Sequence, residues 1–166
     1  GRLQRLRGEI KSSMQELDTA AAILRPLSAK EPQRKEWHRD LAQIEINRAW
    51  TQLAMRAEGV SASTARAEQE LQQVGSDAAS RRIAIELLIV KGAASAAHGY
   101  AATARTLWLQ ARDASARAVA ADSDPSTLAL YASALLRLGR PTEAAAALAK
   151  LDSIGYHHPD LVALRQ

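Results

Sequence analysis

The N-terminal stretch of the chain carries apolar residues at the seven-residue spacing of a long amphipathic helix. Over residues 2–27 the two sets of heptad positions hold Leu3, Ile10, Leu17 and Leu24, and Leu6, Ser13, Ala20 and Leu27. This pattern predicts a helix over residues 2–27, with Pro26 just inside its end and a loop over residues 28–30. Such a seam can pair two chains, or it can pack against a neighbouring helix of the same chain. The small Ser13 and Ala20 favour packing within the chain, and a homodimer through residues 3–27 stays an alternative.

The rest of the chain alternates between helical periodicity and strong break signals. Apolar residues recur at three- and four-residue intervals, and glycine, proline and a cluster of Asp and Ser separate the periodic stretches. The pattern predicts helices over residues 36–58, 61–74, 78–97, 100–120, 125–138 and 141–154, with a short terminal helix over 159–165. Because β-branched residues are few and scattered, no strand is expected. The predicted fold class is all-α, built from antiparallel helical hairpins.

Evenly spaced glycines indicate that the hairpins repeat. The residues that set this register are Gly59, Gly99 and Gly139, forty positions apart, and the small residues Thr64, Ala104 and Ala144, each five positions later. A regular spacing of this length is typical of helical repeat proteins. We therefore expect one domain, in which residues 1–30 form the helix and its loop and residues 31–166 form repeats at about 36–75, 77–121 and 125–154. Armadillo and HEAT repeats have a similar length and are the structural alternative.

Residues 125–151, PSTLALYASALLRLGRPTEAAAALAKL, resemble one tetratricopeptide repeat without a gap. Gly139 stands where a left-handed residue ends the first helix, and Pro141 stands where the second helix begins. Ala144 stands where the family places a small residue between paired helices. The resemblance implies a right-handed superhelix of hairpins with a concave face. It also implies that the chain binds a protein or peptide and does not catalyse a reaction.

Both ends of the chain also resemble a broader bacterial family. The segments are residues 22–32 (AILRPLSAKEP), 36–42 (EWHRDLA), 135–140 (LLRLGR) and 155–159 (GYHHP). They are similar to repeat regions near the C-terminus of proteobacterial eukaryotic-like serine/threonine kinases and related signalling proteins. In such kinases the region follows a transmembrane helix, which implies a periplasmic location for a chain with that parent and a cytoplasmic one otherwise. The glycine-rich loop and the Asp-Phe-Gly motif of a kinase catalytic domain do not occur in this sequence, which has no Phe.

Charge and hydropathy narrow the range of partners. The 166 residues carry a net charge of +4 and a pI of about 9.8, which raises nucleic acid or an anionic membrane as a partner. Acidic residues interleave with the cations, and no aromatic residues accompany them as a stacking surface would require, so the pattern argues against nucleic acid. A basic nucleic-acid adaptor is the weakest alternative. No run approaches the roughly 18 apolar residues of a membrane span, so the chain is not expected to cross a membrane.

No residue pattern predicts catalysis. The lack of cysteine excludes disulfides, thiolate chemistry and zinc sites built on Cys. The histidines are dispersed apart from His157 and His158, which are adjacent in sequence and predict no metal site. No serine lies in a Gly-x-Ser-x-Gly turn. We therefore expect no catalytic residue, no cofactor and no metal, and the three tryptophans are predicted to anchor the core.

The function expected from these observations is a non-catalytic protein-interaction or sensor domain of a larger bacterial signalling protein. A helical oligomerisation module is the alternative. In a repeat stack the first helix of each hairpin lines the concave face, so counting back from the three glycines gives candidate groove positions. These are Glu45, Leu53, Arg56, Glu86, Ile89, Ser126, Ser133 and Arg137. Together with the alanines on the same faces, Ala49, Ala93, Ala96 and Ala129, this lining is mostly small or apolar, which suits a helix, such as the chain's own N-terminal helix, more than an acidic peptide tail.

Overall fold

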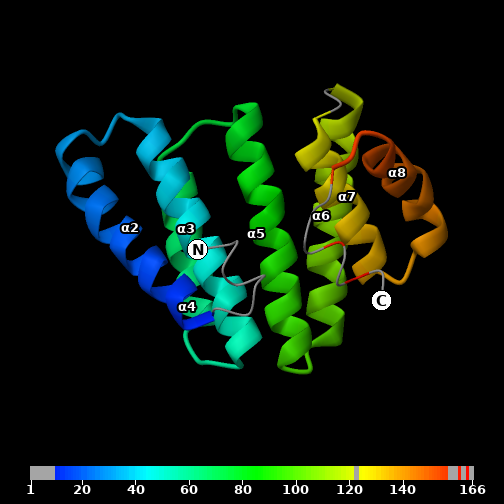
Figure 1. Cartoon of the computed structure of the whole chain (residues 1–166), viewed down its shortest axis with the longest axis horizontal. Coiled ribbons are helices and arrows are strands. Elements are labelled where there is room, and N and C mark those ends of the chain that lie inside the picture. The colour runs from blue at the N-terminus through cyan, green and yellow to red at the C-terminus, as the bar shows by residue number, and fades with distance from the viewer. Residues whose placement is uncertain (1–9, 122–123, 157–160, 162–163, 165–166) are drawn as a thin grey trace. The chain divides into compact units, whose positions relative to one another are not determined.

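The computed structural model describes residues 10–121, 124–156, 161 and 164 (Figure 1). Within these residues every regular element is a helix, which confirms the all-α prediction. The helices are α2 (Ile10–Lys30), α3 (Lys35–Met55), α4 (Val60–Gln72), α5 (Ala78–Ala97), α6 (Ala101–Ala121), α7 (Pro125–Arg137) and α8 (Pro141–Ser153). None of these described helices has the length and apolar character needed to span a membrane. The predicted terminal helix over 159–165 falls largely outside the described residues.

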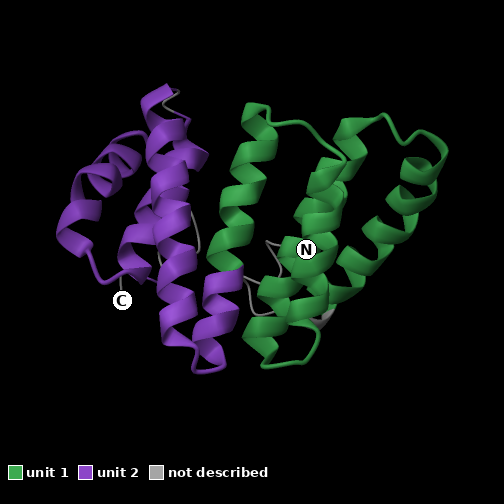
Figure 2. Cartoon of the chain, turned by 180° about the vertical axis from the view of Figure 1, so that it is seen from behind, with its two compact units in different colours: residues 1–90 green, residues 91–166 purple. Residues whose placement is uncertain are grey.

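The chain divides into two compact units, residues 1–90 and 91–166, which Figure 2 colours separately. The first unit contains α2, α3, α4 and most of α5. The second unit contains the end of α5 together with α6, α7 and α8. The boundary falls inside α5, so it does not coincide with any loop that the sequence pattern marks.

In the first unit the heptad seam of α2 packs against α3. Leu17 and Ala21 of α2 form a small apolar core with Ile44 of α3, and Met14 and Leu24 are among the half-buried residues that pack against it. Helix α2 includes Pro26, as predicted, but it continues to Lys30, so the prediction of a loop over residues 28–30 is wrong. A proline inside a helix removes one backbone N–H donor. Pro26 is exposed, which lets water hydrate the carbonyl that has lost its donor, and the helix continues.

The turn between α3 and α4 begins earlier than the sequence indicates. Helix α3 ends at Met55 because Arg56 takes a left-handed conformation, with φ of 51°. The N–H of Ala57 then donates to the carbonyl of Gln52 at 2.9 Å, which satisfies a carbonyl at the helix end. Gly59, predicted to stop α3, instead precedes the first residue of α4 with φ of 99°. The predicted boundaries near residues 58 and 61 are therefore shifted.

The second unit has its core between α7 and α8. Leu128, Ala129 and Ala132 of α7 are buried with Ala147 and Leu151 of α8. The start of α7 is fixed by its N-cap residue, because the carboxylate of Asp124 accepts from the backbone N–H of Thr127 at 2.9 Å. Pro125 follows as the first helical residue, where its missing N–H has no consequence. These signals are local in the sequence, which explains why the start of α7 agrees with the prediction.

The indole of Trp108 in α6 lies against the backbone of α5 at Gly92. A Cβ atom added at Gly92 would come within 2.6 Å of Trp108 Cδ1 and closer still to Nε1. All three tryptophans, Trp37, Trp50 and Trp108, are half-buried rather than fully enclosed. The indole of Trp108 therefore needs a residue without a side chain at position 92, which the sequence analysis did not anticipate.

The evenly spaced glycines all lie in turns, but only Gly99 and Gly139 lie at equivalent places, where the backbone N–H of the next residue donates to the carbonyl of Ser95 and of Leu135. At the first turn Arg56 takes that place, and Gly59 is the N-cap of α4. Gly59, Gly99 and Gly139 each fall in the turn between two consecutive helices, with φ of 99°, 82° and 71°. The residues five positions later, Thr64, Ala104 and Ala144, are all buried. The forty-residue spacing of the sequence thus corresponds to three turns with the same backbone handedness, each followed by a buried small residue.

Candidate functional site

Most of the residues predicted to line a groove take part in helix packing. Glu45, Glu86, Ile89 and Ser133 are buried, Leu53, Ser126 and Arg137 are half-buried, and Arg56 is exposed. The first helix of a hairpin contacts neighbours on several sides, so few of its residues remain open to solvent. A role in partner binding stays a prediction for Arg56 and for the half-buried members.

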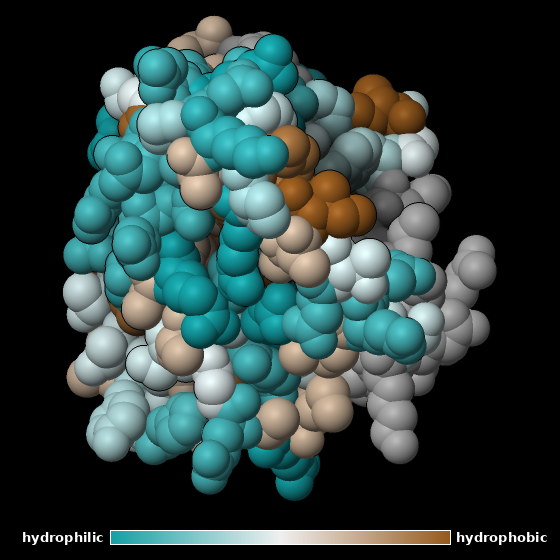
Figure 3. Space-filling model, turned by 90° about the vertical axis from the view of Figure 1, so that its left-hand side faces the viewer, coloured by the Kyte–Doolittle hydropathy of each residue, from teal (hydrophilic) through white to brown (hydrophobic). Residues whose placement is uncertain are grey.

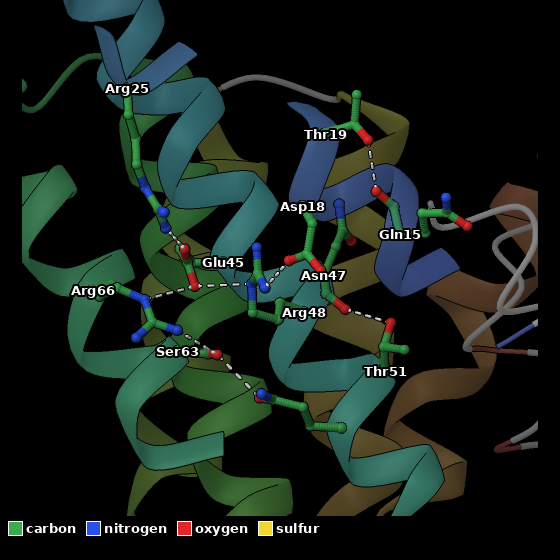
Figure 4. Close-up of polar contacts among 11 residues, drawn as sticks. Gln15, Asp18, Thr19, Arg25, Glu45, Asn47, Arg48, Thr51, Ser63 and Arg66 are labelled. Atoms are coloured by element: carbon green, nitrogen blue, oxygen red, sulfur yellow. Dashed lines mark hydrogen bonds and ion pairs between the residues drawn. The ribbon is translucent and has the colours of Figure 1, made fainter. Parts of the chain in front are cut away.

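Glu45 is a buried carboxylate that three arginines surround (Figure 4). Its side chain is only 3% exposed. Oε1 accepts from Arg25 Nη2 of α2 at 2.8 Å. Oε2 lies 3.0 Å from Arg66 Nε of α4 and 3.4 Å from Arg48 Nε of α3, contacts that are ionic rather than well-aligned hydrogen bonds. A buried carboxylate is unfavourable unless it is paired, and here α2, α3 and α4 each supply a partner.

A second acid completes the cluster. Asp18 of α2 contacts Arg48, whose side chain is 12% exposed. Arg66 Nη2 also donates to Ser63 Oγ at 3.2 Å, and this hydroxyl donates to Gln52 Oε1 at 3.0 Å. Three guanidinium groups therefore face two carboxylates, which leaves one positive charge in excess. We call Arg25, Arg48, Arg66, Glu45 and Asp18 the arginine cluster.

Two of the three arginine side chains in the cluster are accessible to solvent. The side chains of Arg25 and Arg66 are 54% and 43% exposed, whereas Arg48 and Glu45 are enclosed. Among the described residues, Arg25 makes no polar contact other than the one with Glu45, so its Nε and Nη1 donors face water. The arrangement can hold three helices together and can also offer N–H donors to an anion.

A second polar network surrounds His38 near the start of α3. His38 is buried, its Nδ1 lies 2.7 Å from Glu70 Oε2, and its Nε2 lies 3.1 Å from the carbonyl oxygen of Pro32. Ser28 Oγ is 3.4 Å from both ring nitrogens. Serine, histidine and a carboxylate are the residue types of a hydrolase triad, but the triad needs the serine on the free ring nitrogen and open to substrate. Here Pro32 occupies that nitrogen and Ser28 is buried, so the network joins helices.

The tripeptide His38-Arg39-Asp40 has the letters of a kinase catalytic loop but lies inside α3. Arg39 contacts the carboxylate of Asp77 at 3.4 Å. Asp77 precedes α5, and the backbone N–H of Ser80 donates to it at 2.8 Å. This hydrogen bond, assisted by the positive charges of Arg39 and Lys35, holds the pKa of Asp77 below its ordinary value of 3.8. The tripeptide therefore belongs to helix packing and capping.

The described residues contain no group of three or more His, Asp or Glu side chains able to hold a metal ion. The buried Glu86 of α5 instead accepts from Gln43 Nε2 of α3 at 3.0 Å. This contact connects two helices of the first unit, as the arginine cluster does.

Glu45 is among the residues predicted to line a groove, whereas the three arginines around it are not. Arg48 lies three residues after Glu45, a spacing that places both on one helix face, and this signal could have been found. Arg25 and Arg66 reach Glu45 from other helices, and nothing in the sequence pairs them with it. No family model, no curated protein and no solved structure matches the chain.

Proposed function

We propose that this chain is a non-catalytic protein-interaction domain built from helical hairpins of the tetratricopeptide kind. The observation that carries this proposal is that three turns between helices, forty residues apart, each hold a glycine with positive φ, Gly59, Gly99 and Gly139, and that a buried small residue follows each of them. Proteins built from repeated hairpins use their extended faces to bind other proteins. Helices in such a repeat serve as a rigid scaffold on which exposed side chains select the partner.

The polar groups of the described residues give further support. The residues with the chemistry of an active site, His38, Glu70 and Ser28, contact one another and a backbone carbonyl within the helix packing. Glu45 likewise joins three helices. These side chains stabilise the arrangement of α2, α3 and α4, which is the role expected in a scaffold.

The proposal includes a parent protein. We infer that the chain belongs to a larger bacterial signalling protein, such as a transmembrane serine/threonine kinase, because both ends of the chain resemble the repeat regions of such kinases. In that parent the chain would lie in the periplasm, and in another parent it would lie in the cytoplasm. The sequence that precedes Gly1 in the parent tests this part of the proposal directly, since a kinase domain and a membrane span should both be found there.

A peptide selection tests the binding function. The purified chain is immobilised and offered a displayed library of random twelve-residue peptides, and the enriched motif is then synthesised. We expect a shared motif whose peptide binds saturably in calorimetry, while a scrambled peptide of the same composition does not. If repeated selections enrich no motif, or if the scrambled peptide binds equally well, the interaction proposal is wrong.

An oligomerisation module is the second candidate, and the exposed apolar side chains of α2 favour it. Figure 3 faces the side of the molecule where α2 lies, and its surface is mostly hydrophilic with a few hydrophobic side chains. On α2, Ile23 is 60% exposed and Leu27 is 37% exposed. Specific interfaces bury about 800 Å² on each partner, which is more than these two side chains supply. We therefore place oligomerisation second.

Sedimentation velocity separates the two candidates. A dimer through α2 should become a monomer in the double variant Ile23→Glu, Leu27→Glu. The control variant Ala22→Glu, Ala29→Glu adds the same charge at exposed positions of the same helix and should remain a dimer. A wild-type chain that sediments as a monomer at all concentrations would exclude the oligomerisation function.

A further inference from the structure

The half-exposed arginines of the cluster are held in place before any partner arrives. Arg25 of α2 and Arg66 of α4 approach Glu45 from two sides (Figure 4). Because both contact one enclosed carboxylate, their guanidinium groups lie close together. A free arginine on a surface samples many rotamers and loses this freedom when it binds. The contacts with Glu45 have already removed much of that freedom.

Several N–H donors of this pair remain available. Arg25 uses Nη2 for Glu45, and Arg66 uses Nε for Glu45 and Nη2 for Ser63. Among the described residues no acceptor occupies Arg25 Nε and Nη1 or Arg66 Nη1. Both side chains are about half exposed, so a group from outside the chain can reach these donors. Guanidinium groups bind carboxylates and phosphates through such paired donors.

The charge of the cluster selects between these anions. Three arginines face Glu45 and Asp18, which leaves a single positive charge in excess. A carboxylate carries one negative charge and matches this excess, whereas a phosphate monoester carries close to two at neutral pH. On the side that faces Glu45, the two guanidiniums already pair with a carboxylate, at 2.8 Å from Arg25 Nη2 and 3.0 Å from Arg66 Nε. Glu45 and Asp18 repel either anion, and this repulsion is stronger for the more highly charged phosphate.

We propose that Arg25 and Arg66 form a clamp for an acidic side chain, Asp or Glu, of the protein partner. This inference rests on the proposed interaction function and names the chemistry of the partner at one place. The partner carboxylate binds the outward donors of the two arginines while Glu45 holds their inward donors. Arg48 takes no direct part, because it is enclosed between Glu45 and Asp18.

The test uses the whole chain and synthetic peptides of defined charge. The probe is a fluorescein-labelled peptide with Glu alternating with Gly, and its counterpart has Gln in place of Glu. The clamp variant is Arg25→Gln, Arg66→Gln. The matched control is Arg105→Gln, Arg117→Gln, which removes two exposed arginines of α6 and changes the net charge by the same amount. Binding is followed by fluorescence anisotropy at several salt concentrations.

We expect the clamp variant to bind the Glu peptide at least about tenfold more weakly, as the loss of charge-assisted hydrogen bonds implies. The control should change the affinity less than about threefold, and the Gln peptide should not bind measurably. Equal losses in both variants would show that general charge attraction is responsible and would overturn the clamp. If a phosphoserine peptide binds more tightly than the Glu peptide, and this binding depends on the same arginines, the group that the two arginines bind is a phosphate and the carboxylate proposal is wrong.

A second variant and a direct readout cover the case in which the clamp variant fails to fold. The double variant Arg25→Lys, Arg66→Lys keeps the charges next to Glu45 but removes the planar pairs of donors, so it should fold and still bind the Glu peptide more weakly. In the wild-type chain, the Nε–H signals of these two arginines in ¹H–¹⁵N spectra should shift when the Glu peptide is added. Unshifted signals at saturating peptide would overturn the proposal.

A failure of the proposed clamp can be distinguished from a failure of the interaction function. If the peptide selection yields a motif without acidic residues, or one whose binding is unchanged in the clamp variant, the chain is an interaction domain and the clamp is wrong. If the selection yields no motif at all, the interaction function itself has failed.

Discussion

The close approach of Trp108 to Gly92 leads to a prediction whose sign depends on the neighbouring residue. Gly92 lies in the interior of α5, where alanine would ordinarily stabilise the helix by about 1 kcal/mol. The structure opposes this gain, because the added Cβ would come within 2.6 Å of Trp108 Cδ1. The helix backbone cannot retreat easily, so the indole has to move.

The magnitude follows from these two opposing effects. Forcing additional atoms into a packed contact costs about 1–3 kcal/mol, and the helix gain offsets about 1 kcal/mol of this. Trp108 is half-buried, which leaves it some room to shift and places the cost near the middle of this range, at about 2 kcal/mol. We expect Gly92→Ala to reduce the free energy of unfolding by about 1 kcal/mol.

A double-mutant cycle isolates the contact. Trp108→Leu removes the indole atoms that meet the new Cβ, and in this background Gly92→Ala should stabilise the chain by about 1 kcal/mol. The coupling between the two sites is then about 2 kcal/mol. Urea denaturation followed by circular dichroism at 222 nm gives the four free energies, and an unchanged dependence on urea shows that the variants unfold in the same way.

Two results of the double-mutant cycle would contradict the contact between Trp108 and Gly92. If Gly92→Ala stabilises the wild-type chain and the Trp108→Leu variant by the same amount, the indole does not lie over Gly92. If Gly92→Ala destabilises both backgrounds equally, the cost comes from another neighbour of residue 92.

Three further predictions concern the helix start, the packing and the arginine cluster. The pKa of Asp77 is lower in the folded chain than its ordinary value of 3.8. The stabilisation by its carboxylate is therefore complete above pH 3.8 and is lost as the pH falls below that value. The melting temperatures of the wild type and Asp77→Asn should converge at low pH. Ala144→Leu should cost about 1–3 kcal/mol in urea denaturation, whereas Ala145→Leu at the exposed neighbouring position should be almost neutral. Glu45→Gln should cost about 1.5–3 kcal/mol, and a loss below about 0.5 kcal/mol would show that the three arginines do not depend on its charge.

Local signals in the sequence predicted the helices well where the capping chemistry is explicit. The bounds of α5 agree with the prediction, and α7 begins at the predicted Pro125 because Asp124 caps it within the same four residues. The errors fall where two signals compete. The end of α2 was predicted one residue after Pro26, although an exposed proline in a helix supported by tertiary packing removes only one hydrogen bond and the helix continues to Lys30. Gly59 was read as the end of α3, although Arg56 had already ended it.

The candidate site was less accessible to sequence reasoning because its members come from three helices. A glutamate in a helix usually faces solvent, so nothing in the sequence indicates that Glu45 is buried. The groove register placed it on an open face because that register counts residues along the chain and ignores what packs against them. Only the tertiary arrangement brings Arg25 and Arg66 to this carboxylate.

The arginine cluster also explains how a weak apolar seam can fix the orientation of α2. Ser13 and Ala20 contribute little apolar surface, so the seam alone leaves the rotation of α2 about its own axis poorly determined. Arg25 and Asp18 lie on one flank of α2 and contact Glu45 and Arg48. Turning α2 would remove Arg25 from the enclosed carboxylate of Glu45 and Asp18 from the enclosed Arg48, which is far more unfavourable than shifting an apolar contact. The same orientation leaves Ile23 exposed away from the cluster and presents the outer edge of Arg25 to solvent. One buried glutamate thereby contributes to determining which side of α2 faces solvent.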